Sequence, residues 1–105
     1  MSVPLNLITC IVEQGKAEGI IDAALEKGAQ AATYFPARGR GVREKIGVMG
    51  MFIKEDKDVI LIVTKTEHTQ GVFDVVVALG ALREKGKGFA FVQPVLSAVG
   101  FIDDL

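Results

Sequence analysis

The sequence predicts an α+β fold of the ferredoxin-like class, in which elements in the order βαββαβ form a four-stranded antiparallel sheet with both helices on one face. Two observations support this prediction. Four short apolar runs of strand length are interspersed with two longer stretches whose apolar residues recur at helical spacing. Glycines, prolines and charged residues separate the segments, and right-handed crossovers then place both helices on the same side of the sheet.

The first two elements are a strand over residues 5–12 and a helix over residues 16–27. The strand run is mostly apolar on both alternating faces, which is typical of a strand that is covered on both sides. Gly28 follows the helix where a left-handed residue often ends one. The apolar residues at helical spacing are Ala17, Ile20, Ile21, Ala24 and Leu25.

The next two elements are strands over residues 31–37 and 58–64. The first contains Thr33, Tyr34 and Phe35, which favour extended structure. Its Pro36 cannot donate to a ladder and therefore indicates an edge or a strand end. The second has an unbroken apolar core over residues 59–63, which is too short for a helix and predicts a central strand.

A second helix and a fourth strand complete the order. Thr69 is expected to cap this helix, whose apolar stripe runs from Val72 to Leu82 and includes a run of three valines. Residues 89–92 are expected to form the last strand, which ends at Pro94. The remaining residues, through Leu105, could add one more extended piece.

The predicted sheet leaves one face without helices, although its first and third strands are apolar on both sides. A chain of 105 residues, read as a single domain over residues 1–105, has nothing left to cover that face except a copy of itself. A closed homo-oligomer is therefore expected.

Two glycine-rich cationic segments, residues 38–45 and 83–88, dominate the charge distribution. They hold seven of the 12 Lys and Arg residues and two of the 13 Asp and Glu residues, so they carry about +5 and the rest about −6. Glycine lets consecutive amides turn toward an anion while neighbouring cations supply charge. This pattern predicts a focused anion site and argues against nucleic-acid binding, which needs a broad basic face.

Several other classes of protein are not expected. The lone cysteine, Cys10, is predicted to lie in the core, and the lone histidine, His68, is predicted to lie on the surface, so neither a disulfide nor a metal site is expected. No arrangement typical of a catalytic site is apparent, and an enzyme is not expected. Without a membrane-length apolar run or a signal-peptide pattern, the chain is expected to be cytoplasmic.

In its order of elements and its two basic segments, the chain resembles the PII family of trimeric signal-transduction proteins over nearly its whole length. The resemblance implies a homotrimer that binds an adenine nucleotide between neighbouring subunits, with no prosthetic group. It also implies a flexible loop, about residues 39–53, that moves with ligand and touches a regulated partner. The phosphate loop of the family falls at about residues 83–89.

The resemblance assigns nucleotide-binding roles to individual residues. Thr33 matches a threonine near the adenine, and Val63 falls on the strand that flanks the base. The glycines that open the mobile loop and those of the phosphate loop are matched by Gly39, Gly41, Gly86 and Gly88.

The chain also departs from the family pattern. Arg43 falls near a glutamine that helps coordinate metal and nucleotide, and a cation there favours direct phosphate contact and weakens the case for magnesium. Phe89 replaces a lysine, and the tail from Ser97 to Leu105 has no arginine. The substitute cations are Arg40, Arg43, Lys85 and Lys87. The effector is thus expected to be AMP, ADP or ATP, with fewer phosphates favoured, or a different anion.

Residues 46–53 are apolar and glycine-spaced, a composition suited to docking on a hydrophobic groove or on the cytoplasmic face of a membrane transporter. An irregular fifth strand packed within the trimer is an equal alternative. The candidate docking residues are Val48, Met49, Met51 and Phe52. The regulated partner is expected to be a transporter or a metabolic enzyme. The only tyrosine is Tyr34, in the preceding strand, so the uridylylation seen in some members is not predicted.

Two alternatives to the regulator remain open from the sequence. A CutA-like trimer linked to metal tolerance shares this fold, but such proteins are expected to show aromatic-rich strands and metal ligands, whereas this chain has no Trp and one His. An assembly protein that binds no nucleotide is the other, in which the basic segments only keep the loops soluble.

Overall fold

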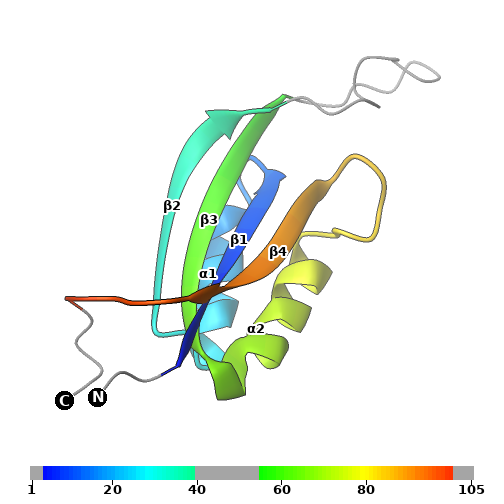
Figure 1. The fold of residues 1–105 in the computed structure, drawn as a ribbon. Coiled ribbons are helices and arrows are strands. Elements are labelled where there is room, and N and C mark those ends of the chain that lie inside the picture. The colour runs from blue at the N-terminus through cyan, green and yellow to red at the C-terminus, as the bar shows by residue number, and fades with distance from the viewer. Residues whose placement is uncertain (1–3, 40–54, 101–105) are drawn as a thin grey trace, which may run out of the picture.

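The computed structural model describes residues 4–39 and 55–100 of the chain. Their elements follow the predicted order βαββαβ (Figure 1). In chain order they are β1 (Leu5–Glu13), α1 (Ala17–Glu26), β2 (Ala31–Arg38), β3 (Asp56–Lys65), α2 (Thr66–Leu79) and β4 (Gly88–Val95).

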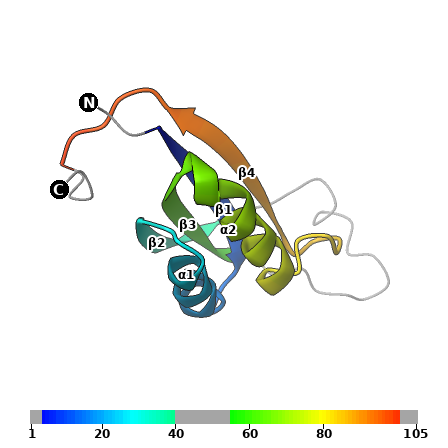
Figure 2. The same cartoon turned by 90° about the horizontal axis from the view of Figure 1, so that it is seen from below.

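The four strands form one sheet in the order β2-β3-β1-β4, and every neighbouring pair is antiparallel. Both helices lie on the same face (Figure 2), so the predicted ferredoxin-like fold is confirmed. The strand over residues 58–64 is central, as predicted, and belongs to β3. The edge strands β2 and β4 accommodate Pro36 and Pro94, since an edge strand can lack one ladder donor.

The core lies between the sheet and the two helices. In the register of β1 and β3, Ile8 is opposite Ile62 and Cys10 is opposite Ile60, and all four side chains are fully buried. Ile20 of α1 and Val72 and Val76 of α2 close this layer from the helical side, as does Ala24. The prediction that Cys10 belongs to the core is confirmed.

The second helix begins earlier than predicted. It starts at Thr66, directly after β3, so the interpretation of Thr69 as its cap is wrong. The hydroxyl of Thr69 instead accepts from the Asn6 amide at 3.0 Å, lies 2.7 Å from the Thr64 hydroxyl, and donates to the Lys65 carbonyl at 3.1 Å. A side chain used in this tertiary network is not available to cap a helix locally. The helix also ends before Leu82, which packs against the core from the following turn.

The sheet face opposite the helices is apolar and uncovered by any described residue. By register it carries Ile11 beside Val59, and Thr9 beside Leu61. Three phenylalanines extend this face onto the edge strands and remain partly exposed: Phe35 at 46%, Phe89 at 60% and Phe91 at 37%. We call this surface, with Leu7 and Val63, the open face.

The region beyond β4 adds no further strand within residues 96–100, and Leu96 and Val99 are almost fully exposed there. In the parts of the chain that the structure describes, neither helix has the length and apolar character needed to cross a membrane.

Candidate functional site

Both basic segments begin at the same end of the sheet. The first follows Arg38 at the end of β2, and the second lies in the turn that leads to Gly88 at the start of β4 (Figure 1). Since β2 and β4 are opposite edges, three strand spacings separate them, which amounts to roughly 14 Å across the sheet. Within one subunit the two segments therefore share an end but not an edge.

The end of β2 is tied to the start of β3 by charge and by the backbone. The guanidinium of Arg38 contacts a Glu55 carboxylate oxygen at 2.9 Å and an Asp56 carboxylate oxygen at 3.0 Å. The Gly39 amide donates to the Glu55 carbonyl at 2.9 Å. The Arg38 guanidinium is therefore paired with two neighbouring acids, and Gly39 lies at the point where the chain leaves β2.

The turn between α2 and β4 depends on glycine at two positions. Gly86 has a φ of +78° and Gly88 a φ of +149°, a region of backbone space that favours glycine. A Cβ atom on Gly88 would also overlap the carbonyl oxygen of Ile11 on β1. The glycines of the predicted phosphate loop thus fix the path of the turn and bring Lys87 to the end of β1.

Lys87 meets an acidic partner there. Its ammonium lies 3.4 Å from one carboxylate oxygen of Glu13, the last residue of β1, and Lys16 lies 3.4 Å from the other oxygen. Partial burial acts to raise the pKa of the Glu13 carboxyl, but the hydrogen bonds and charges of the two lysines together outweigh it and lower the pKa below its usual value. Glu13 is therefore ionised at neutral pH.

A third lysine lies in the same row of the sheet. Lys57 on β3 is opposite Glu13 in the register and is only 4% exposed. It also lies near Gly39, since a Cβ atom on that glycine would be 3.9 Å from Lys57 Cγ. This row, which we call the charged row, comprises Glu13, Lys16, Lys57 and Lys87.

No sequence pattern marks Glu13, Lys16 or Lys57 as site residues, because none of them lies in a glycine-rich segment. The missing signal was the sheet order itself. Once β1 and β3 are known to be adjacent and antiparallel, the charged residues at the end of one and the start of the other must meet.

The predicted nucleotide residues fall into two groups. Thr33 and Val63 lie together on neighbouring strands of the open face, since Val63 is opposite Ala31 and Leu61 is opposite Thr33. Gly39 directly follows β2 and lies six residues beyond Thr33, roughly 20 Å away at the rise of a strand.

The second group, near the charged row, comprises Gly39, Gly86, Lys87 and Gly88, with Lys85 exposed in the same turn. Arg40, Gly41 and Arg43 lie outside the described residues. So do the candidate docking residues, Val48, Met49, Met51 and Phe52.

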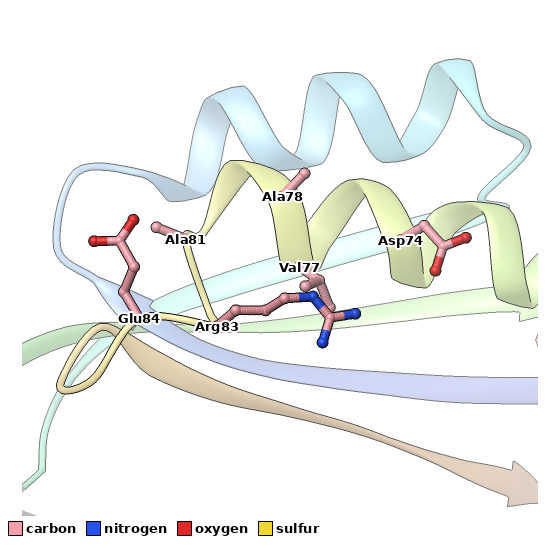
Figure 3. Close-up of a pocket in the computed structure, with 6 residues that line it drawn as sticks. All are labelled: Asp74, Val77, Ala78, Ala81, Arg83 and Glu84. Atoms are coloured by element: carbon pink, nitrogen blue, oxygen red, sulfur yellow. The ribbon is translucent and has the colours of Figure 1, made fainter.

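A shallow hollow of about 400 Å³ lies beside the C-terminal half of α2 (Figure 3). Its lining consists of Asp74, Val77, Ala78, Ala81, Arg83 and Glu84. A second hollow of about 350 Å³ shares Val77 and Arg83 with it and reaches Gly88 and Phe89. In Figure 3 the Arg83 side chain runs along α2 below Val77, whereas the Glu84 side chain points away from Arg83. The hollow that reaches Gly88 is therefore apolar with one cation, Arg83, whereas the hollow beside α2 also carries two carboxylates, Asp74 and Glu84.

The arrangement is suited to binding an anion. Two lysines, Lys16 and Lys87, pair with one carboxylate at the end of the sheet where both glycine-rich segments begin, and the backbone of a third, Lys57, lies opposite that carboxylate residue. Within residues 4–39 and 55–100, no group of His, Cys, Asp and Glu side chains is placed to hold a metal ion. His68 packs its ring near Gly28, at the other end of α1 from Lys16, and is partly exposed.

Comparison with known proteins gives a consistent result. The family model of "Nitrogen regulatory protein P-II" matches residues 5–101. The "Nitrogen fixation nifHD region glnB-like protein 1" of Methanococcus maripaludis is 27% identical over 92 residues, which cover 87% of this chain and 88% of that protein. The protein of the same name from Methanobacterium ivanovii is 26% identical over 95 residues, 90% of each chain.

Among solved structures, the Arabidopsis thaliana PII protein bound to citrate has a TM-score of 0.65 at 23% sequence identity. The match covers 90% of this chain and 79% of the Arabidopsis chain. At this level of identity the likeness concerns the fold.

Proposed function

This chain belongs to the family of nitrogen regulatory protein P-II, and from that premise we propose that it binds an adenine nucleotide between subunits and so controls a partner protein. The family consists of signal-transduction regulators that bind small effectors, and not of enzymes, in agreement with the sequence prediction. Because the matching family is P-II, the CutA-like alternative is set aside.

One observation above all supports a site between subunits. The strand order puts the two glycine-rich segments at one end of the sheet but on opposite edges, roughly 14 Å apart. A seam in which the β2 edge of one subunit meets the β4 edge of the next brings one segment from each subunit together. A nucleotide in that seam contacts both segments at once, so its binding depends on assembly.

The open face supports a homotrimer as the assembly. Three partly exposed phenylalanines, with the aliphatic residues beside them, form an apolar surface of the kind that monomeric proteins rarely leave in water. Packing copies of this face around a threefold axis closes the assembly and leaves no open face unpaired.

The effector is an anion whose phosphate group is held by cations of the two segments. Lys87 directly precedes β4 and contacts Glu13, and Lys85 is exposed in the same turn. The citrate bound by the Arabidopsis protein, itself an organic anion, supports an anionic effector. With Phe89 in place of a lysine and no arginine in the tail, AMP and ADP are favoured over ATP.

The regulated partner docks on the segment after β2, through Val48, Met49, Met51 and Phe52. It is a transporter or a metabolic enzyme, and the protein acts in the cytoplasm. Nucleotide binding in the seam changes the presentation of this segment and thereby the affinity for the partner.

Titration calorimetry with AMP, ADP, ATP and cyclic AMP tests nucleotide binding. At least one of them is expected to bind, and Lys87→Ala is expected to weaken its binding by roughly 1–3 kcal/mol, as for a charge-assisted phosphate contact. Lys27→Ala removes an exposed lysine at the other end of α1 and is the matched control, with unchanged affinity expected. The absence of heat with every nucleotide would overturn the proposal.

A further inference from the structure

The carboxylate of Glu13 bridges two lysines, Lys16 and Lys87. Its two carboxylate oxygens are divided between them, each at 3.4 Å from one ammonium. Lys16 is at the start of α1 and Lys87 precedes β4, so the carboxylate joins two segments that are 71 residues apart in sequence. No sequence pattern had marked Glu13, because it lies at the end of an apolar strand.

This carboxylate and a ligand phosphate require the same partner. An ammonium has three donor protons, and its strongest hydrogen bonds go to anionic oxygens. A phosphate that approaches Lys87 therefore meets an ammonium already paired with Glu13 and is also repelled by the carboxylate charge. Lys16 is the second partner of the Glu13 carboxylate, and the backbone of Lys57 lies opposite Glu13 in the register.

We propose that Glu13 is an internal competitor of the effector, a specificity-determining residue whose carboxylate occupies Lys87 in the free protein and is displaced when the anion binds. This inference rests on the proposed function, since it concerns the same anion site. Displacement releases Lys87 to the anion, while Glu13 keeps Lys16 as its remaining partner. The competition weakens every anion at this site and favours a ligand that gains further contacts elsewhere, as a nucleotide does through its base and ribose.

A competitor and a merely structural residue predict opposite results for Glu13→Gln. The substitution keeps the size of the side chain and removes its charge. If Glu13 competes, the variant binds anions more tightly; if Glu13 orients Lys87 for the ligand, the variant binds them more weakly. The ion pairs are partly exposed, so the fold is expected to tolerate the change.

The test compares the wild-type protein, Glu13→Gln and the matched control Glu26→Gln, an exposed acid at the end of α1. Each is titrated with ADP and, separately, with inorganic pyrophosphate at low ionic strength, where screening is weak. Glu13→Gln is expected to bind both anions about tenfold more tightly than wild type, and Glu26→Gln to bind them as wild type does. In a Lys87→Ala background, most of the gain from Glu13→Gln is expected to disappear.

The outcomes separate this inference from the proposed function. If wild type binds ADP and Glu13→Gln binds it equally or more weakly, the competitor role is overturned and the function stands. If no variant binds a nucleotide but Glu13→Gln binds pyrophosphate more tightly than wild type, the function fails and the competition stands. If neither anion binds to any variant, both are overturned.

Discussion

At the scale of single residues, several residues each make one contact that holds two elements together. Gly88 allows β4 to begin against β1, Arg38 joins the ends of β2 and β3, and Glu13 holds Lys87 at the end of the sheet. Tyr34 donates to a Glu18 carboxylate oxygen at 3.1 Å, and this hydrogen bond raises the pKa of the tyrosine. Each of these roles depends on a neighbour that is distant in sequence.

Gly88→Ala is expected to destabilise the protein by about 1–3 kcal/mol, because its positive φ strains any other residue. The overlap of the new methyl group with the Ile11 carbonyl adds to this cost. Gly19→Ala is the matched control, since Gly19 lies in α1 with open space around it, and there alanine is expected to stabilise by about 0.5–1 kcal/mol. Thermal and denaturant unfolding measure both changes. Equal effects of the two substitutions would contradict the role of Gly88.

Cys10 is expected to be inert to thiol reagents in the folded protein. Burial raises the pKa of its thiol to about 12, and only the thiolate is a strong nucleophile. Because the folded pKa is raised, keeping this thiol protonated contributes stability to the folded state. That contribution is complete below the pKa of the unfolded thiol and is lost as the pH rises toward 12. The rate of reaction with an aromatic disulfide reagent should therefore follow the opening of the structure. Rapid labelling without denaturant would show that the thiol is accessible.

At the scale of elements, the junction between β3 and α2 is the place where local and tertiary signals disagree. Thr69 has the residue type of a helix cap, yet it lies in the first turn of a helix that begins at Thr66. Its hydroxyl joins β1, β3 and α2 through Asn6, Thr64 and the Lys65 carbonyl. The helix start is thus set by a hydrogen-bond network between elements, which replaces a side-chain cap.

Thr69→Val is expected to destabilise the protein by about 1–3 kcal/mol, because it leaves the Asn6 amide and the buried Thr64 hydroxyl without their partner in a partly buried network. Thr66→Val is the control, since the Thr66 hydroxyl is exposed and lies 3.5 Å from its only recorded partner, the Pro4 carbonyl. Its effect is expected within about 0.5 kcal/mol. Chemical denaturation compares the two, and a Thr69→Val variant as stable as wild type would refute the network.

At the scale of the whole molecule, the fold has two layers, and only one face of its sheet is covered by helices. The helices cover one face of the sheet, whereas the open face presents a phenylalanine pair, Phe89 and Phe91, with ring centres 5.6 Å apart. The charged row lies at the end of the same sheet. Assembly through the open face and anion binding at the subunit seam are therefore expected to depend on each other.

Phe91→Asp is expected to convert the protein to monomers, because it places a charge within the open face. Leu25→Asp is the matched control: Leu25 is also exposed, but it lies on α1 in the helical layer, so the oligomer is expected to persist. Light scattering gives the mass of each. A wild-type monomer, or an oligomeric Phe91→Asp, would contradict assembly through this face.

The order of elements could be predicted because period and turn residues are local properties. The apolar run of residues 59–63 indicated a central strand, and Pro36 indicated an edge, and both are confirmed. The glycines of residues 86 and 88 marked a turn for the same reason. The charged row could not be predicted as a whole, since Lys57 and Lys87 come near Glu13 only because strands distant in sequence are adjacent in the sheet.

The sequence by itself determined the identity and order of the elements and the apolar character of both faces of β1 and β3, because these follow from side-chain spacing along the chain. The tertiary structure alone decided that Glu13 divides its charge between Lys16 and Lys87, and that Thr69 serves a network instead of a cap. The physical reason is distance: hydrogen bonds and ion pairs act over a few ångströms in space, and the sheet register, not the sequence separation, sets which groups come that close.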